Sequence, residues 1–357
     1  MRMSRKAQVQ GWGVAGVAFG SLINPPLKAA GGYLARFILT VTTGAVANGN
    51  LTAVTASADS PWNVIQSLFL RDPLGQPIVQ TDGYGLYLIN KYSGLVGEGV
   101  KSDPSALPSF SAVTASGTAG LAGLFTFKLS IPLQLDSAAY CALSSLNAAA
   151  QPTLNIQLNP STVVYTAVTG NTVPTLNITC EQEFWAVPIQ DSSLAPPDVG
   201  SSSQFSFAPG AQGIASGAAV RVTAPRVGTW IHTLICVMRD NANARVDDYP
   251  VTDLTMWVDG VPVVFESFAD RVDKMAVMTD GITRDTGVIA YTFRDAVKQI
   301  ISLADTHDIL LPTTPATLFE IGGTFQAVVS SPATLQFYTG ELYPVNAARV
   351  PYTHLSQ

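Results

Sequence analysis

The chain has 357 residues, of which 47% are hydrophobic and 12% are charged, and its formal net charge at pH 7 is −6. The hydrophobic content excludes a disordered chain, and the length suits two domains of about 150 to 200 residues each. An acidic chain lacks the concentrated Lys and Arg that neutralise phosphates, so we expect no direct binding to nucleic acid.

The charged fraction is about half of the roughly 25% that is usual for soluble domains. A surface with so little charge, rich in Ala, Val, Thr, Ser and Gly, predicts that neighbouring copies cover much of it. We therefore expect an obligate assembly.

Residues 1–30 form a basic and apolar arm. Basic residues precede the sequence GWGVAGVAFGSLI, whose apolar residues recur at helical spacing, so the pattern predicts a short N-terminal helix that ends at Pro25-Pro26. The apolar stretch is shorter than the about 20 residues needed to cross a bilayer. The residues expected to contact a membrane or a neighbouring copy are Arg2, Arg5, Lys6, Trp12 and Phe19.

Three interpretations of this arm remain open. It is a helix lying on a membrane surface, an arm packing on a neighbouring copy, or a signal peptide with small residues for cleavage in LKAAGG at residues 27–32. On the first two interpretations the arm stands apart from the domains, and deletion of residues 2–23 is expected to leave both domains folded.

From Tyr33 onward, short runs of β-branched and aromatic residues separated by Gly, Pro, Asn and Asp predict strands. In the first half these runs are ARFILTVTTGAV, FTFKLSIPLQL, TLNIQLN and TLNITCEQEFWAVPI. In the second half they are TWIHTLICVMR, DLTMWVDGVPVVFE, GVIAYTFR, ATLFEIGGTFQAVV and ATLQFYTGELYPV. Residues 191–219 are rich in Pro, Gly and Ser and predict a linker, which places the domain boundary near residue 205.

The two halves, residues 31–205 and 206–357, repeat the same order of segments. A predicted hairpin, SLFLRDPLGQPIVQ in one half and TMWVDGVPVVF in the other, is followed by a segment with helical potential, YGLYLINKY or SFADRVDKMAVM. Each half then closes with two strands, TLNIQLN and TLNITCEQEFWAVP against TLFEIGGTF and TLQFYTGELYP. The order predicts two versions of one all-β domain.

This organisation resembles the double jelly-roll major capsid proteins of tailless, tectivirus-like icosahedral viruses, including bacteriophages. The resemblance covers nearly the whole chain and lies in segment order, most clearly in FTFKLSIPLQLDSAAYCALSSLNAAAQPTLNIQLNP and DTHDILLPTTPATLFEIGGTF. It implies two tandem eight-stranded jelly-roll β-sandwiches. The long Gly-, Ser- and Ala-rich loop from Val96 to Leu121 departs from the family pattern.

The resemblance also implies a function and partners. Its members form homotrimers that act as pseudo-hexagonal tiles in a virion shell, in contact with neighbouring capsomers and with penton or minor capsid proteins. In members that have an internal lipid membrane, the N-terminal arm faces it. The implied role is structural rather than enzymatic.

No catalytic, cofactor or metal site is predicted. Cys141, Cys180 and Cys236 are too widely spaced for a zinc site and are expected to be small buried residues. The GWGVAG sequence fits a dinucleotide motif literally but lacks the preceding strand and the acidic residue that follows.

Two acidic patterns have alternatives. The acidic residues of RDNANARVDDYPVTD, residues 239–253, suggest a calcium loop, but Ala242 and Ala244 fall at ligand positions, which favours a solvated turn. Glu181 and Glu183 lie two apart on one strand face, a spacing open to acid and base chemistry and equally typical of an ordinary strand surface.

Two other functions therefore remain as alternatives. One is a secreted β-sandwich binding protein or adhesin, with residues 1 to about 30 cleaved as a signal peptide. The other is an enzyme on tandem jelly rolls that resembles glycan amidases, with Glu181 or Glu183 as its acid.

Overall fold

A computed structural model describes most of the chain in two units. The described residues are 6–28, 32–44, 51–73, 75, 77–93, 103–116, 121–134, 143–144, 151–170, 172–186, 202–207, 212–214, 219–223, 227–278, 283–293, 311–313, 318–325 and 333–344. Those up to Gln204 belong to unit 1 and those from Phe205 to Pro344 belong to unit 2.

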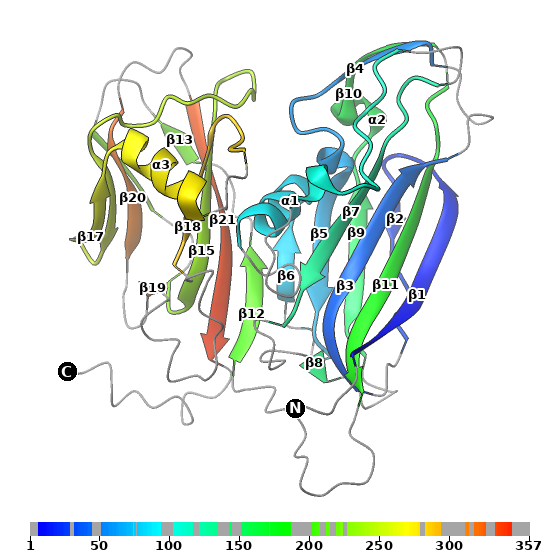
Figure 1. The fold of residues 1–357 in the computed structure, drawn as a ribbon, viewed down its shortest axis with the longest axis horizontal. Coiled ribbons are helices and arrows are strands. Elements are labelled where there is room, and N and C mark those ends of the chain that lie inside the picture. The colour runs from blue at the N-terminus through cyan, green and yellow to red at the C-terminus, as the bar shows by residue number, and fades with distance from the viewer. Residues whose placement is uncertain are drawn as a thin grey trace, which may run out of the picture. The chain divides into compact units, whose positions relative to one another are not determined.

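Unit 1 contains two antiparallel sheets, one built on its longest strands (Figure 1). The first sheet has the order β1 (Lys6–Val17), β11 (Leu176–Ala186), β3 (Gly32–Thr43) and β7 (Thr126–Pro132), with β8 (Leu143–Ser144) also on β3. Within unit 1 the second has the order β2 (Leu22–Ile23), β9 (Thr153–Leu158), β5 (Ile65–Arg71) and β6 (Pro77–Thr81), and this sheet continues beyond β6.

Further elements of unit 1 lie between these strands in the chain. Helix α1 (Gly83–Tyr92) follows β6, and its N-terminus is capped by Asp82, whose side chain accepts a hydrogen bond of 2.5 Å from the Gly85 N–H. The remaining elements are the ribbon of β4 (Ala53–Ala56) and β10 (Tyr165–Thr169), helix α2 (Ser161–Val164) and the 3₁₀ turns Trp62–Val64 and Pro104–Ala106.

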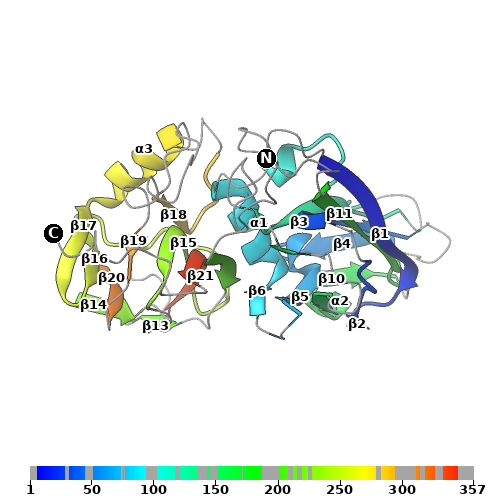
Figure 2. The ribbon, with the colours of Figure 1, turned by 90° about the horizontal axis from the view of Figure 1, so that it is seen from below.

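The core of unit 1 comes from alternate residues of its strands. Phe37, Leu39 and Val41 on β3 are fully buried, and the residues between them are only partly buried. The same alternation buries Leu154, Ile156 and Leu158 of β9. Because alternate side chains leave a strand on opposite faces, each sheet presents one apolar face to the other, as in a β-sandwich. In the end-on view of Figure 2, β3 and β11 lie in one layer and β5 and β6 in the other.

Unit 2 also contains two sheets. Its first sheet has the order β18 (Val288–Thr292), β15 (Trp230–Arg239) and β21 (Ala333–Pro344), with β13 (Gln212–Ile214) on β21 and β19 (Leu311–Pro312) on β15. Its second has the order β14 (Ala219–Thr223), β20 (Phe319–Thr324), β16 (Leu254–Val258) and β17 (Val261–Glu266). Helix α3 (Phe268–Met278) follows β17. Strand β12 (Ser202–Phe207) spans the change from unit 1 to unit 2.

The pairing in the two units is the same strand for strand. Strands β1, β2, β3, β5, β6, β7, β9 and β11 of unit 1 correspond to β13, β14, β15, β16, β17, β18, β20 and β21 of unit 2. The short strands β8 and β19 also match, and a helix follows the fifth strand of each series. The described residues therefore form two jelly rolls of eight principal strands each, which confirms the predicted fold class and repeat.

Most predicted elements are confirmed. Both hairpins form, and that of unit 2 turns at Asp259 and Gly260, which have φ of 48° and 79°, as a two-residue turn of this type requires. Both predicted helices form as α1 and α3. Cys180 and Cys236 are buried as expected, and Cys141 lies outside the described residues.

The predicted N-terminal helix is wrong. Residues Lys6–Val17 form strand β1, which pairs antiparallel with β11 from Lys6 opposite Trp185 to Val17 opposite Leu176. Gly11, Gly13 and Gly16 disfavour a helix, and a Cβ at Gly11 would lie 2.9 Å from the Cys180 carbonyl oxygen. The free edge of β11 therefore decides the structure of a segment whose apolar residues suited either period.

The predicted linker is wrong in part. Within residues 191–219, Ser202–Phe207 and Gln212–Ile214 are strands, and β14 begins at Ala219. Gln212–Ile214 is shorter than the about four residues over which alternation becomes visible, and the polar run Ser202–Gln204 obscures the alternation of Phe205 and Phe207.

Gly83 offers a test of how tightly α1 packs on the rest of unit 1. A Cβ at Gly83 would lie 2.0 Å from the Trp62 carbonyl oxygen, so we expect Gly83→Ala to destabilise unit 1 by about 1 to 3 kcal/mol. A Cβ at Gly213 would meet nothing within 4 Å, so Gly213→Ala is the control, with an expected effect within about 0.5 kcal/mol. Urea unfolding followed by circular dichroism measures both, and equal midpoints for the two variants would contradict the packing.

Candidate interaction surfaces

The predicted arm residues lie partly within unit 1. Arg2 and Arg5 are outside the described residues, and Lys6 begins β1. Trp12 is part-buried on β1 opposite Cys180, and the Phe19 ring meets the Tyr165 ring edge to face at 5.7 Å. The described part of the arm therefore belongs to the first jelly roll. Among the described residues, no helix has the length and apolar character to cross a membrane.

This placement changes what truncation should do. Deletion of residues 2–23 removes β1 from the edge of β11, so we expect unit 1 to melt at least about 5 °C lower, rather than to stay intact. Deletion of residues 2–5, which precede β1, is the control. Scanning calorimetry of both truncated chains measures this, and an unchanged transition after the longer deletion would show that β1 contributes nothing to the sandwich.

The loop that departs from the family pattern packs partly on its own unit. Phe110 stacks on Trp62 with ring centroids 5.3 Å apart, and Trp62 stacks in turn on Tyr87 of α1 at 4.4 Å. Asp103 lies 3.1 Å from the Nζ of Lys91, which is almost fully buried on α1. The described part of this loop thus covers α1 and compensates the buried Lys91 charge.

Of the two carboxylates on β11, Glu181 and Glu183, the second forms an ion pair with the neighbouring strand β3. Glu183 lies directly opposite Arg36 on β3, and the Arg36 guanidinium donates to both carboxylate oxygens, with Nη2 3.0 Å from Oε1. Glu181 lies opposite Ile38 in the same register. A two-pronged ion pair between adjacent strands fixes Glu183 as a sheet contact.

The acidic residues of the 239–253 segment hold separate parts of unit 2. Asp240 Oδ1 accepts hydrogen bonds from the N–H groups of Ala242 and Ala244, at 2.9 and 2.8 Å, which makes the segment a tight turn. Asp253 Oδ2 accepts from the Thr324 N–H at 2.7 Å. Among the described residues, no group of three or more His, Cys, Asp or Glu side chains is placed to hold a metal ion.

Asp247 forms the strongest electrostatic contact of this segment. Its two oxygens accept hydrogen bonds from Arg284 at 2.9 and 2.5 Å, and Oδ1 also accepts from the Gly287 N–H at 2.6 Å. Burial raises the pKa of this carboxyl, but the hydrogen bonds from Arg284 and Gly287 and the Arg284 charge outweigh burial and lower the pKa below its ordinary value.

The lowered pKa predicts how this contact depends on pH. A carboxyl whose pKa is lower in the folded state contributes stability above its unfolded pKa of about 3.9, and that stability is lost as the pH falls through the folded pKa. We expect Asp247→Asn to destabilise the chain at pH 7 by about 0.5 to 1 kcal/mol, because the pair is partly exposed. The difference from the wild type should shrink below about pH 4.

Denaturant unfolding between pH 2 and pH 7 measures this dependence, with Asp273→Asn on the exposed side of α3 as the control. A stability gap that stays constant over that range would mean that Asp247 acts through its shape rather than its charge.

The described thiols are inert. Burial, followed by the nearby Glu181 charge, raises the pKa of the Cys180 thiol to about 12. Burial also raises the pKa of the Cys236 thiol. Protonated buried thiols are poor nucleophiles and poor metal ligands, so both cysteines serve the core.

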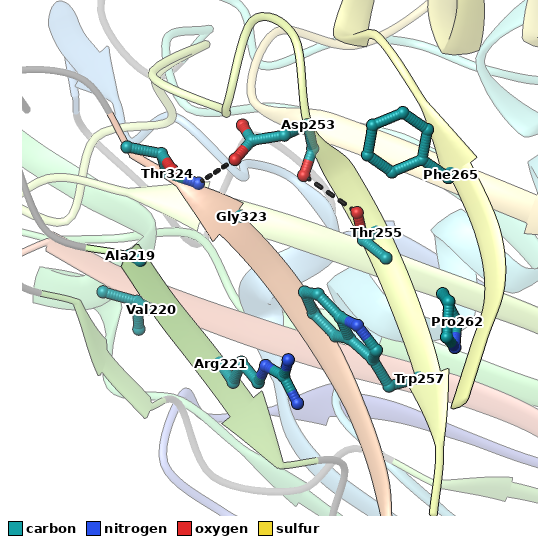
Figure 3. Close-up of a pocket in the computed structure, with 10 residues that line it drawn as sticks. All are labelled: Ala219, Val220, Arg221, Asp253, Thr255, Trp257, Pro262, Phe265, Gly323 and Thr324. Carbon is teal, nitrogen blue, oxygen red and sulfur yellow. Dashed lines mark hydrogen bonds between the residues drawn. The ribbon is translucent and has the colours of Figure 1, made fainter. Parts of the chain in front are cut away.

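The outer face of the β14–β20–β16–β17 sheet carries an open groove of about 610 Å³ (Figure 3). Its floor includes Trp257, and the Arg221 guanidinium lies 4.2 Å from the Trp257 ring centroid and 3.6 Å from Glu320. Phe265 and Pro262 of β17 form one wall. Sequence analysis missed this groove, although the run VPVVF after a hairpin turn, apolar at every position, is the signal that marks it.

Gly323 lines this groove, and both Gly322 and Gly323 lie close against the backbone of neighbouring segments. A Cβ at Gly322 would lie 1.9 Å from the Val220 carbonyl oxygen, and a Cβ at Gly323 would lie 2.3 Å from the Asp253 carbonyl oxygen. The groove is mainly apolar and aromatic, and Arg221 and Asp253 are the charged residues that line it. Both protein interfaces and ligand pockets have this composition.

Comparison with known proteins finds similar structures only. No family model matches the chain, and no curated protein matches it in sequence. The crystal structure of the STIV major capsid protein matches with a TM-score of 0.66 at 13% identity, over 98% of this chain and 99% of that chain. STIV is the Sulfolobus turreted icosahedral virus.

Two further solved structures match over similar lengths. The PBCV-1 virus capsid matches with a TM-score of 0.63 at 10% identity, over 95% of this chain and 93% of that chain. The major capsid protein of bacteriophage PM2 matches with a TM-score of 0.52 at 10% identity, over 96% of this chain and 99% of that chain. At these identities the likeness shows a shared fold, which extends over both jelly rolls.

Proposed function

We propose that this chain is a major capsid protein that builds the shell of an icosahedral virion. The observation that carries the proposal is the presence of two jelly rolls with identical strand pairing in one chain, matched over nearly its full length by viral capsid proteins. A structural role without catalysis is consistent with the ion-paired Glu183 and with the buried, protonated thiols.

The unit of assembly is a homotrimer. Three copies with two jelly rolls each make a six-part tile, and such tiles contact one another laterally and meet penton or minor capsid proteins where the shell closes. The low charged fraction of 12% supports dense packing, because covered surfaces need little charge for solubility. An internal lipid membrane is a further partner, approached through Arg2, Arg5 and Lys6 at the start of the chain. Nucleic acid is not a direct partner of this acidic chain.

The alternatives fit the structure less well. Cleavage of a signal peptide near residue 30 would remove both β1 and β2, one strand from each sheet of the first jelly roll. A glycan amidase would use Glu181 or Glu183 as an acid, but Glu183 accepts hydrogen bonds from Arg36 through both oxygens. An ion-paired carboxylate is a poor proton donor.

Assembly tests the proposal directly. We expect the purified full-length chain to sediment as a trimer and, on concentration, to form closed particles or sheets of hexagonal tiles by electron microscopy. The intact mass should include the N-terminal residues, since the first sheet contains β1. A stable monomer lacking about 30 residues would contradict the capsid function and favour a secreted protein.

A further inference from the structure

Strand β17 of unit 2 is an exposed apolar edge. Val261, Val263 and Phe265 are 62%, 45% and 71% exposed, and they lie within one strand of six residues. In the described part of the chain, β17 is the end strand of its sheet and pairs with β16 alone. Folded proteins usually protect such an edge with charge or a cover, so this concentration of apolar surface indicates a contact.

The duplicated fold provides an internal comparison. Strand β6 pairs with β5 as β17 pairs with β16, but β6 is not an end strand of its sheet, whereas β17 is. On β6, Ile78 is 6% exposed and Val79 is 1% exposed, so the apolar residues of that strand are buried within a single chain. Strand β17, the counterpart of β6 in unit 2, also carries apolar side chains, but in a single chain they are exposed.

The exposed side chains continue into the groove beside them. Phe265 and Pro262 form its wall, and Trp257 is held on its floor by the Arg221 guanidinium. A rigid aromatic floor beside protruding apolar residues matches the centre of a protein interface, where aromatic anchors bury most of their area. We call Val261, Pro262, Val263, Phe265 and Trp257 the β17 patch.

The charges around the β17 patch indicate which partner covers it. Arg221 and Lys274 carry positive charge, and Asp259 and Asp270 carry negative charge. All four residues are exposed. A border of mixed sign suits a protein surface, whereas an anionic membrane favours a border of Lys and Arg alone. A chain with only 12% charged residues offers such a weakly charged protein surface on its own copies.

We infer that the β17 patch docks against a second copy of this chain. This inference rests on the proposed capsid function and deepens it, by naming the surface that one copy presents to the next. The contact is heterologous, because in a cyclic trimer the patch of each copy meets a different surface of its neighbour. Pro262 removes one N–H from the edge strand and disfavours continued strand pairing there, so the contact is made by side-chain packing.

The test changes the apolar character of the β17 patch in the full-length chain. We expect the double variant Val263→Asp with Phe265→Asp to weaken association at least tenfold by sedimentation velocity, leaving monomers at concentrations where the wild type is trimeric. Its melting temperature as a monomer should equal that of the wild-type monomer, because both side chains are exposed. Val168→Asp on β10, at 48% exposed, is the matched control and should assemble like the wild type.

Hydrogen exchange on the wild-type chain gives an independent measurement that needs no variant. Amides of residues 261–266 should exchange fast at dilutions that yield monomers and slowly in the trimer. Protection that requires added phosphatidylglycerol vesicles and does not depend on protein concentration would overturn the inference in favour of a lipid contact.

The outcomes separate this inference from the proposed function. Trimers and particles formed equally well by the double variant, with fast exchange at β17, would overturn the role of the β17 patch and leave the capsid function standing. A wild-type chain that stays monomeric at all concentrations would overturn both.

Discussion

The pairing between an early long strand and the last strand of each jelly roll is the constraint on which the structure depends. Strand β11 pairs with β3 from Leu176 opposite Thr43 to Ala186 opposite Gly32, and β21 pairs with β15 in the same way in unit 2. These pairs join segments that are far apart in sequence, so loop-closure entropy opposes them and burial of the strand faces must offset it. Once this pair forms, each of its two strands has one free edge, and the remaining strands of that sheet pair with these edges.

The same constraint explains why the chain uses its first residues as it does. A jelly roll that ends on β11 leaves the far edge of β11 open, and β1 fills that edge with glycines where close approach to the β11 backbone is needed. Phe19 then packs on Tyr165, whose hydroxyl donates to the Gly123 carbonyl oxygen at 2.7 Å. Residues Lys6–Val17 are thus part of the first sandwich. A contact that stabilises this strand therefore also stabilises unit 1.

Duplication of one fold leaves the two units with different surfaces at matching positions. The apolar residues of β6 are buried, whereas those of β17 are exposed beside an aromatic groove. In the capsid tile proposed above, the uncovered strand β17 is the surface that we infer to contact the next copy. The acidic residues Asp240, Asp247 and Asp253 of unit 2 accept hydrogen bonds from loops and strand ends of their own unit.

Local sequence patterns predicted the fold class, the repeat, both hairpins and both principal helices, because alternation, turns that contain Asp and Gly, and helical spacing are local signals. They also predicted that Cys180 and Cys236 are core residues. That Lys6–Val17 is a strand depends on the tertiary fold, because the apolar residues of this segment suit a helix or a strand and the open edge of β11 selects the strand. The tertiary fold likewise decided that Glu183 pairs with Arg36 and that Phe265 is exposed, since both depend on which strands become neighbours and which remain at the edge.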